Sequence, residues 1–141
     1  MFRVVIGMSD ELMQIRNKVR DAASQLDEHL IKLVLFPNCD SKLHWRAEIH
    51  SCLNKVARVK GSNKFPKYKV LREGLSVYED MVPEIMQVIK DDYDSLTPSD
   101  ISSQQVLDCV VRYHDWLAKQ LSQHGAVSSK QIFAELESLG L

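Results

Sequence analysis

Apolar residues recur in steps of three and four along almost the whole chain, and this spacing is the strongest constraint on its fold. The first run predicts one long helix, which Ser9 or Asp10 caps and which ends near Phe36 because Pro37 follows. Its stripe comprises Leu12, Ile15, Val19, Ala22, Leu26, Leu30 and Leu33. The chain of 141 residues holds only 5 Gly and 4 Pro. So few turn-forming residues predict few, long elements and exclude a β-sandwich or barrel with its many short strands.

Two more runs have the same helical spacing and clear boundaries. One begins at Asp40 or Ser41 and ends at Gly61, which suits a left-handed residue after a helix. It carries Trp45, Ile49, Cys52, Val56 and Val59. The other follows a turn with capping residues at 96–100 and ends at Gly125. Its stripe is Leu107, Val110, His114, Leu117 and Leu121, so the imidazole of His114 is predicted to lie in the core or in an interface, bonded to a carbonyl.

Proline marks the helix between these two. It is predicted to begin near Pro66 and to run to Ile89, with a stripe of Leu71, Leu75, Tyr78, Val82, Ile85 and Ile89. Inside it, Pro83 removes an amide donor and clashes with the preceding turn, which costs about 3 kcal/mol in a helix interior. We therefore expect a kink near Val82 or two shorter helices.

A short closing helix has the clearest start signal. Ser128 and Gln131 have the spacing of a capping box, and Val127 with Ile132 fits a hydrophobic staple. Together the patterns predict an all-α fold, an antiparallel bundle of about five helices in a single domain that spans residues 1–141.

The first eight residues allow two structures, a short strand or a flexible apolar lead-in. Met8 followed by Ser9 also fits an alternative natural start. No apolar run reaches the length of a secretory signal or the roughly 20 residues of a membrane span. The 3 cysteines have neither disulfide-framework nor zinc-knuckle spacing. We therefore expect a cytoplasmic protein that does not enter a membrane.

Charge is unevenly distributed although the net charge is only −1. Residues 1–70 hold 13 Lys or Arg and 7 Asp or Glu, whereas residues 71–141 hold 5 and 12. One segment carries cations and an aromatic ring without an intervening acid: Lys55, Arg58, Lys60, Lys64, Lys67, Tyr68, Lys69 and Arg72. Such a segment suits phosphates and exposed bases, but it equally suits solvent or the acidic face of a partner. The overall acidity disfavours a dedicated nucleic-acid binder.

Motifs for catalysis or cofactor binding are not recognisable, and we expect no cofactor. The candidates for a metal site are His44, Glu48 and Cys52, which recur every four residues and would need a second helix, with His29 or His114, to complete the ligand shell. A surface ion pair beside a buried thiol is the simpler interpretation. An enzyme that uses His29, His44 or His50 is therefore the third hypothesis.

Residues 28–33 (Glu-His-Leu-Ile-Lys-Leu), then Pro37, then residues 44–49 (His-Trp-Arg-Ala-Glu-Ile) resemble the bacterial domain-of-unknown-function family twenty-nine. That family has a Glu-His-Leu-Leu-Lys helix, a short loop with Pro and a Trp-Arg-x-x-Ile helix. The likeness covers about residues 20–60. It implies a small bacterial helical protein without assigned activity and supplies no catalytic residues. The residues themselves predict packing of Leu30 and Leu33 against Trp45 and Ile49.

The leading functional hypothesis is a non-enzymatic interaction protein that binds a protein partner or itself. The alternative is a nucleic-acid-associated accessory factor that uses the basic segment Lys55–Arg72.

Overall fold

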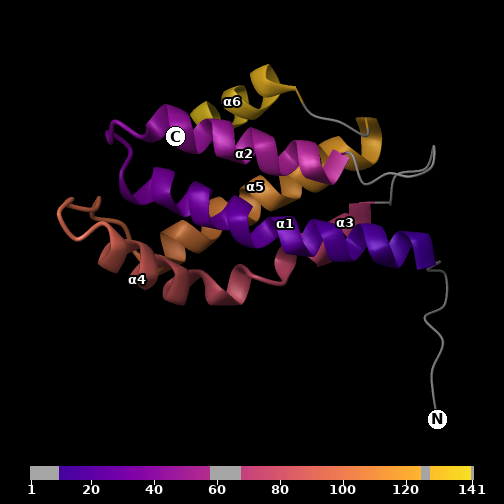
Figure 1. Cartoon of the computed structure of the whole chain (residues 1–141), viewed down its shortest axis with the longest axis horizontal. Coiled ribbons are helices and arrows are strands. Elements are labelled where there is room, and N and C mark those ends of the chain that lie inside the picture. Colours follow the sequence, from indigo (N-terminus) through magenta and orange to yellow (C-terminus); the bar gives the residue numbers. More distant parts are fainter. Residues whose placement is uncertain (1–9, 58–67, 125–127, 141) are drawn as a thin grey trace, which may run out of the picture.

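Helices account for the fold, as the apolar spacing predicts. The computed structural model describes residues 10–57, 68–124 and 128–140. These residues contain no β-strand, which confirms the all-α prediction, and their elements are α1 (Asp10–Leu35), α2 (Lys42–Ala57), α3 (Tyr68–Ser76), the 3₁₀ helix η1 (Glu79–Met81), α4 (Val82–Asp92), α5 (Ser103–His124) and α6 (Ser129–Ser138) (Figure 1). The predicted lead-in 1–8, the alternative start at Met8, and the boundaries at Gly61, Pro66 and Gly125 lie outside the described residues.

The longest helix, α1, runs through the middle of the molecule and forms an antiparallel hairpin with α2 (Figure 1). It ends at Leu35, two residues before Pro37, as predicted. The four residues expected to pack across the turn, Leu30, Leu33, Trp45 and Ile49, are all buried in one core. The rings of Phe36, Trp45 and Tyr93 pack against one another beside the turn, tilted or edge to face, with centroids 5.8–6.5 Å apart.

A loop from α4 to α5 closes the same end of the bundle. Ser99 donates its backbone N–H to the carbonyl of Leu35 (2.7 Å) and its hydroxyl to the carbonyl of Val34 (2.8 Å). It therefore satisfies two carbonyls that the last turn of α1 leaves open. The N-terminus of α5 is capped by Ser102 and not by a residue of the turn at 96–100. The hydroxyl of Ser102 accepts from the backbone N–H of Gln105, and the side chain of Gln105 accepts from the backbone N–H of Ser102.

The predicted third helix is broken into two, with η1 between α3 and α4. Pro83 lies in the first turn of α4, where a proline costs little because its amide would have no helical partner. Within α4 the predicted stripe residues Val82 and Ile89 are buried, and Ile85 is partly buried and packs against the core. Met86, which was not on the predicted stripe, is buried as well.

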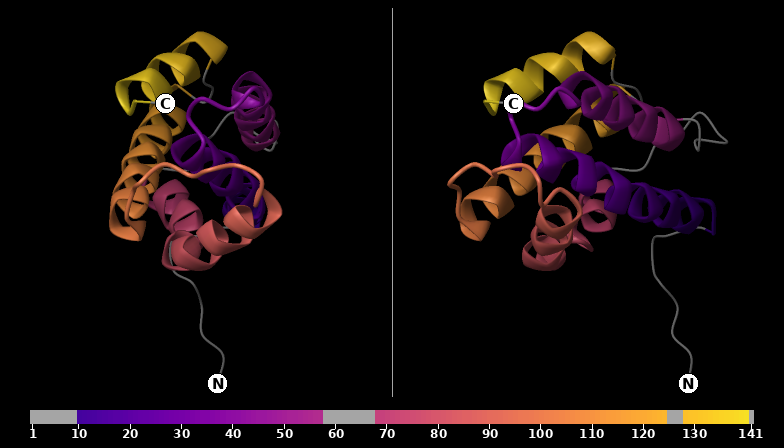
Figure 2. Two further views of the ribbon diagram at one scale, coloured as in Figure 1. Left: turned by 90° about the vertical axis from the view of Figure 1, so that its left-hand side faces the viewer. Right: turned by 60° about the vertical axis from the view of Figure 1, so that its left-hand side comes forward.

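The remaining helices complete two sides of the bundle. α5 packs against α1, α3 and α4, whereas α2 and α6 lie on the side of α1 opposite to α3 and α4 (Figures 1 and 2). The capping box of α6 is confirmed: Ser128 and Gln131 each accept from the other's backbone N–H. Among the described helices, none combines the length and the hydropathy that crossing a bilayer requires.

Candidate functional site

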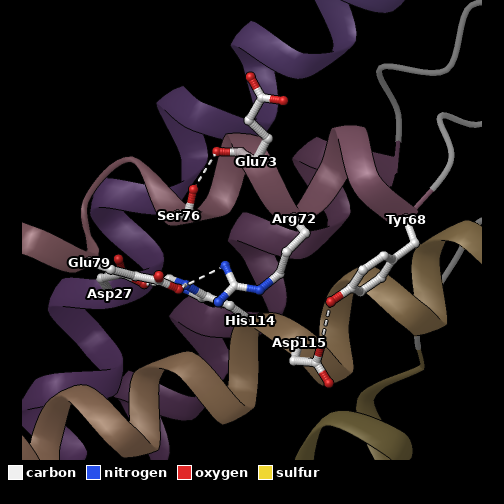
Figure 3. A network of polar contacts seen from close by, with 8 residues as sticks. All are labelled: Asp27, Tyr68, Arg72, Glu73, Ser76, Glu79, His114 and Asp115. Carbon is white, nitrogen blue, oxygen red and sulfur yellow. Dashed lines mark hydrogen bonds and ion pairs between the residues drawn. The ribbon is translucent and has the colours of Figure 1, made fainter.

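Four charged residues from four elements meet inside the bundle. We call Asp27 of α1, Arg72 of α3, Glu79 of η1 and His114 of α5 the His114 cluster (Figure 3). The side chains of Asp27 and His114 are both 0 % exposed, and those of Glu79 and Arg72 reach the surface only at 15 % and 20 %. Burial of so many charges is costly unless they are paired, so their geometry decides what the cluster does.

Both ring nitrogens of His114 face a carboxylate. Nε2 lies 2.5 Å from Asp27 Oδ1, and Nδ1 lies 2.8 Å from Glu79 Oε2. An imidazole that donates to two carboxylates carries a proton on each nitrogen and is therefore a cation. The guanidinium of Arg72 adds a second positive charge, with Nη1 at 2.8 Å from Glu79 Oε2. Two cations and two anions balance within the cluster.

The pKa shifts follow from this arrangement. Burial would lower the pKa of His114, but its hydrogen bonds to Asp27 and Glu79 outweigh burial, so that pKa is raised. Burial raises the pKa of Asp27, although the bond from His114 opposes the change. Burial would also raise the pKa of Glu79, yet hydrogen bonds from His114 and Arg72 lower it overall. The raised pKa favours the protonated form of His114, and the lowered pKa favours the ionised form of Glu79.

The role available to the cluster is structural: its ion pairs link separate elements of the bundle. A substrate cannot reach His114 while the bundle is closed, because the ring is completely covered. Asp27 Oδ2 makes no hydrogen bond, so its single partner in the cluster is His114. Glu79, by contrast, has a second partner and some solvent. The cluster thus joins α1, α3 and α5 to η1, whose three residues are all outside the buried core.

A second polar contact lies at the neighbouring surface. The hydroxyl of Tyr68 donates to Asp115, which also pairs with Lys119 at 2.9 Å. The hydrogen bond from Tyr68 lowers the pKa of Asp115, and that from Lys119 adds to the effect. This contact ties the start of α3 to α5 (Figure 3).

The second feature of interest is a set of apolar residues that runs from the turn after α3 through η1 onto α4. Met81, Ile85 and Val88 have helical spacing, and Val77 precedes them. We call these four residues the α4 face. Met81 is 46 % exposed, Val77 49 % and Val88 58 %, while Ile85 is half-buried. Exposed carboxylates of Asp80, Glu84 and Asp91 stand beside the stripe, and we call them the acidic rim.

The metal-site candidates do not converge. His44 is 68 % exposed and its Nε2 lies 4.0 Å from Glu48 Oε1. Cys52 is buried, and its thiol points to Gln25 Oε1 at 3.8 Å. In the described parts of the chain, no three His, Cys, Asp or Glu side chains form a group suited to a metal ion. The interpretation as a surface ion pair beside a buried thiol fits this placement.

The other histidines proposed for catalysis are also dispersed. The Nδ1 of His29 lies 2.7 Å from the carbonyl oxygen of Gln25 on its own helix, and His50 is half-buried on α2. His114 lies in the core as predicted, but the predicted carbonyl partner was wrong, since its partners are two carboxylates.

Of the basic segment, only part can be placed. The side chain of Lys55 and the whole of Arg58, Lys60, Lys64 and Lys67 lie outside the described residues. Lys69 is exposed, whereas Tyr68 and Arg72 contact Asp115 and Glu79 within the molecule. Phosphate binding by this segment stays a hypothesis.

Sequence reasoning missed the His114 cluster and the α4 face, although both left a signal. Asp27 follows Ala23 by four residues and precedes Leu30 by three, which places a carboxylate on the buried side of α1. A buried acid on one helix and a buried histidine on another are candidates for pairing. Met81, Ile85 and Val88 also repeat at helical spacing, one position before Val82, Met86 and Ile89.

Comparisons of the chain with protein-family models, with curated proteins and with solved structures returned no match. The resemblance of residues 20–60 to family twenty-nine stays a prediction, and the function is argued from chemistry.

Proposed function

We propose that this protein is a non-enzymatic interaction module whose α4 face binds a basic amphipathic helix of a partner protein. The observation that carries the proposal is the exposed stripe of Met81, Ile85 and Val88 beside the acidic rim. Single exposed apolar residues are ordinary on a protein surface, but several at helical spacing lie along one side of a helix, and a group of exposed apolar residues is typical of an interface.

The pattern of α4 is broader than the bundle needs. At about 100° per residue, the buried and exposed apolar positions together cover an arc of roughly 160°. Only the part that contains Val82, Met86 and Ile89 is used by the core. The rest is available for a second helix that lays its own apolar stripe along α4.

Charge complementarity identifies the occupant. Asp80, Glu84 and Asp91 are exposed along one side of the α4 face, so a partner with Lys or Arg beside its apolar stripe gains favourable pairs and a faster encounter. A second copy of the chain fits less well, because a two-fold dimer through α4 pairs one acidic surface with another and supplies no cations beside the stripe. In an antiparallel pair the two acidic rims would also lie on the same side and repel.

The location of the protein belongs to the same proposal. All three cysteines, Cys39, Cys52 and Cys109, are free thiols, which supports a reducing compartment such as the cytoplasm.

A synthetic peptide provides the test. The probe is a fluorescein-labelled helix with Leu at positions i, i+3, i+4 and i+7 and Lys between them, followed by fluorescence anisotropy. We expect saturable binding that Val88→Asp weakens about tenfold or more, since the new carboxylate sits in the apolar contact. Leu43→Asp is the matched control, because Leu43 is 74 % exposed but lies on α2. It is expected to bind like the wild type.

Two further peptides separate the alternatives. A peptide of the same composition in scrambled order has no apolar face and is expected to bind weakly, as is a peptide with Glu in place of Lys. Equal binding of all three peptides, or equal loss in Val88→Asp and Leu43→Asp, contradicts the proposal. Sedimentation velocity without peptide tests self-association: a dimer that Val88→Asp dissociates would identify a second copy as the occupant and overturn the proposed partner.

A further inference from the structure

Glu79 and Met81 place the buried charge cluster and the proposed binding surface on the same short element. Both belong to the three-residue helix η1, Glu79 facing the His114 cluster and Met81 facing solvent. Among the described residues, the Glu79 carboxylate links η1 to α5 through His114 Nδ1 and to α3 through Arg72 Nη1, both at 2.8 Å. A change in this carboxylate's contacts therefore acts on the position of Met81.

The protonation state of His114 determines whether its ring can bond to both carboxylates. As a cation, its ring donates to Asp27 and Glu79 at once. A neutral ring keeps one N–H and presents a lone pair at the other nitrogen. That lone pair must then face one of the two carboxylates, which is repulsive at hydrogen-bond distance.

Burial determines which carboxylate loses its bond. Asp27 is 0 % exposed and its Oδ2 has no hydrogen-bond partner, so losing the bond from Nε2 would leave a buried carboxylate without any donor. Glu79 is partly exposed and keeps Arg72 as a partner. The remaining proton therefore stays on Nε2 toward Asp27, and the contact between Nδ1 and Glu79 breaks.

We propose that loss of a proton from His114 breaks its contact with Glu79, shifts η1 and weakens binding at the α4 face, so that the protein holds its partner at lower pH and releases it as the pH rises. This inference rests on the proposed function. The charged groups that face His114 are Asp27 from α1, Arg72 from α3 and Glu79 from η1. The raised pKa of His114 places the transition above that of an ordinary histidine.

The linkage is measurable without any partner. Proton NMR of the full chain follows the ring of His114 and the methyl group of Met81 between pH 5.5 and 9. We expect both signals to move with one midpoint, because the proton and η1 move together. A Met81 signal that does not follow the His114 midpoint overturns the inference.

Glu79→Gln is the decisive variant. A glutamine accepts from the protonated ring through its oxygen and donates to the neutral ring through its amide, so η1 is held in both states. The ring of His114 should still titrate, while the Met81 signal stays unchanged. A Met81 signal that moves as much as in the wild type contradicts the mechanism. His44→Gln removes an exposed histidine of α2 and is the matched control, expected to titrate like the wild type at Met81.

Peptide binding separates this inference from the proposed function. The Kd of the basic amphipathic peptide is expected to rise about fivefold or more across the His114 midpoint in the wild type and to stay constant in Glu79→Gln. Binding that is constant across the midpoint in the wild type overturns the inference and leaves the proposed function standing. Absence of binding at every pH, with Met81 still following His114, refutes the proposed function instead.

Discussion

Replacing His114 with Ala removes the group that links both buried carboxylates, and we expect a large loss of the free energy of unfolding. Asp27 would keep a fully buried carboxylate with neither oxygen hydrogen-bonded to a cluster residue. Breaking a buried ion pair by removing one partner costs about 3–5 kcal/mol. Small domains unfold with about 5–15 kcal/mol, so this one side chain supports a substantial part of the total.

Urea unfolding followed by circular dichroism measures the effect. With a slope of about 2 kcal/mol per molar, the expected cost lowers the midpoint by about 1.5–2.5 M. His44→Ala is the matched control, because the side chain of His44 is 68 % exposed. Its effect should stay within about 0.5 kcal/mol.

A double-mutant cycle tests whether the loss comes from the pairing. Asp27→Ala removes the carboxylate that His114→Ala leaves unpaired, so the double variant should lose less stability than the two single variants added together, by about 0.5–3 kcal/mol. Additive losses, or a cost of His114→Ala below about 1 kcal/mol, would refute the reasoning that the ion pairs hold the cluster together.

The other predictions concern pH and two helix starts. The pKa of His114 is raised in the folded chain, so its contribution to stability is complete below about pH 6.5, the pKa of a histidine in the unfolded chain. This contribution is lost as the pH rises through the pKa of His114 in the folded chain. The urea midpoint should therefore fall over this pH range, and it should fall less in Asp27→Asn. Ser128→Ala removes the cap of α6 and should cost about 0.5–2 kcal/mol, with faster amide exchange at Gln131, whereas Lys130→Ala should change neither. Pro83→Ala should change the free energy of unfolding by less than about 1 kcal/mol in urea unfolding, since Pro83 lies in the first turn of α4. A gain or a loss of about 3 kcal/mol would contradict that placement.

Local signals in the sequence predicted the helices well. Pro37 ends α1 and the Ser128 capping box begins α6, because each effect acts within a few residues of its cause. Pro83 predicted the break between α3 and α4, but not the turn of 3₁₀ helix that precedes it. The stripe positions Val82 and Ile89 are buried as the spacing predicts, and Met86 is buried beside them.

The functional features depend on contacts that local spacing does not specify. His114 meets Asp27 across 87 residues and Glu79 across 35, and the pattern of each helix alone does not select these partners. The α4 face depends on packing as well. Of its four residues, only Ile85 lies on an apolar stripe predicted from the sequence, and the packing of α1 and α5 determines which side of α4 they cover.

Methyl NMR during titration with the basic amphipathic peptide shows directly whether the α4 face is the binding surface. We expect chemical-shift changes concentrated at Val77, Met81, Ile85 and Val88, while the methyl groups of Leu43 on α2 stay unchanged. Changes centred on Leu43, or none on the four residues of the α4 face at saturating peptide, would contradict this expectation.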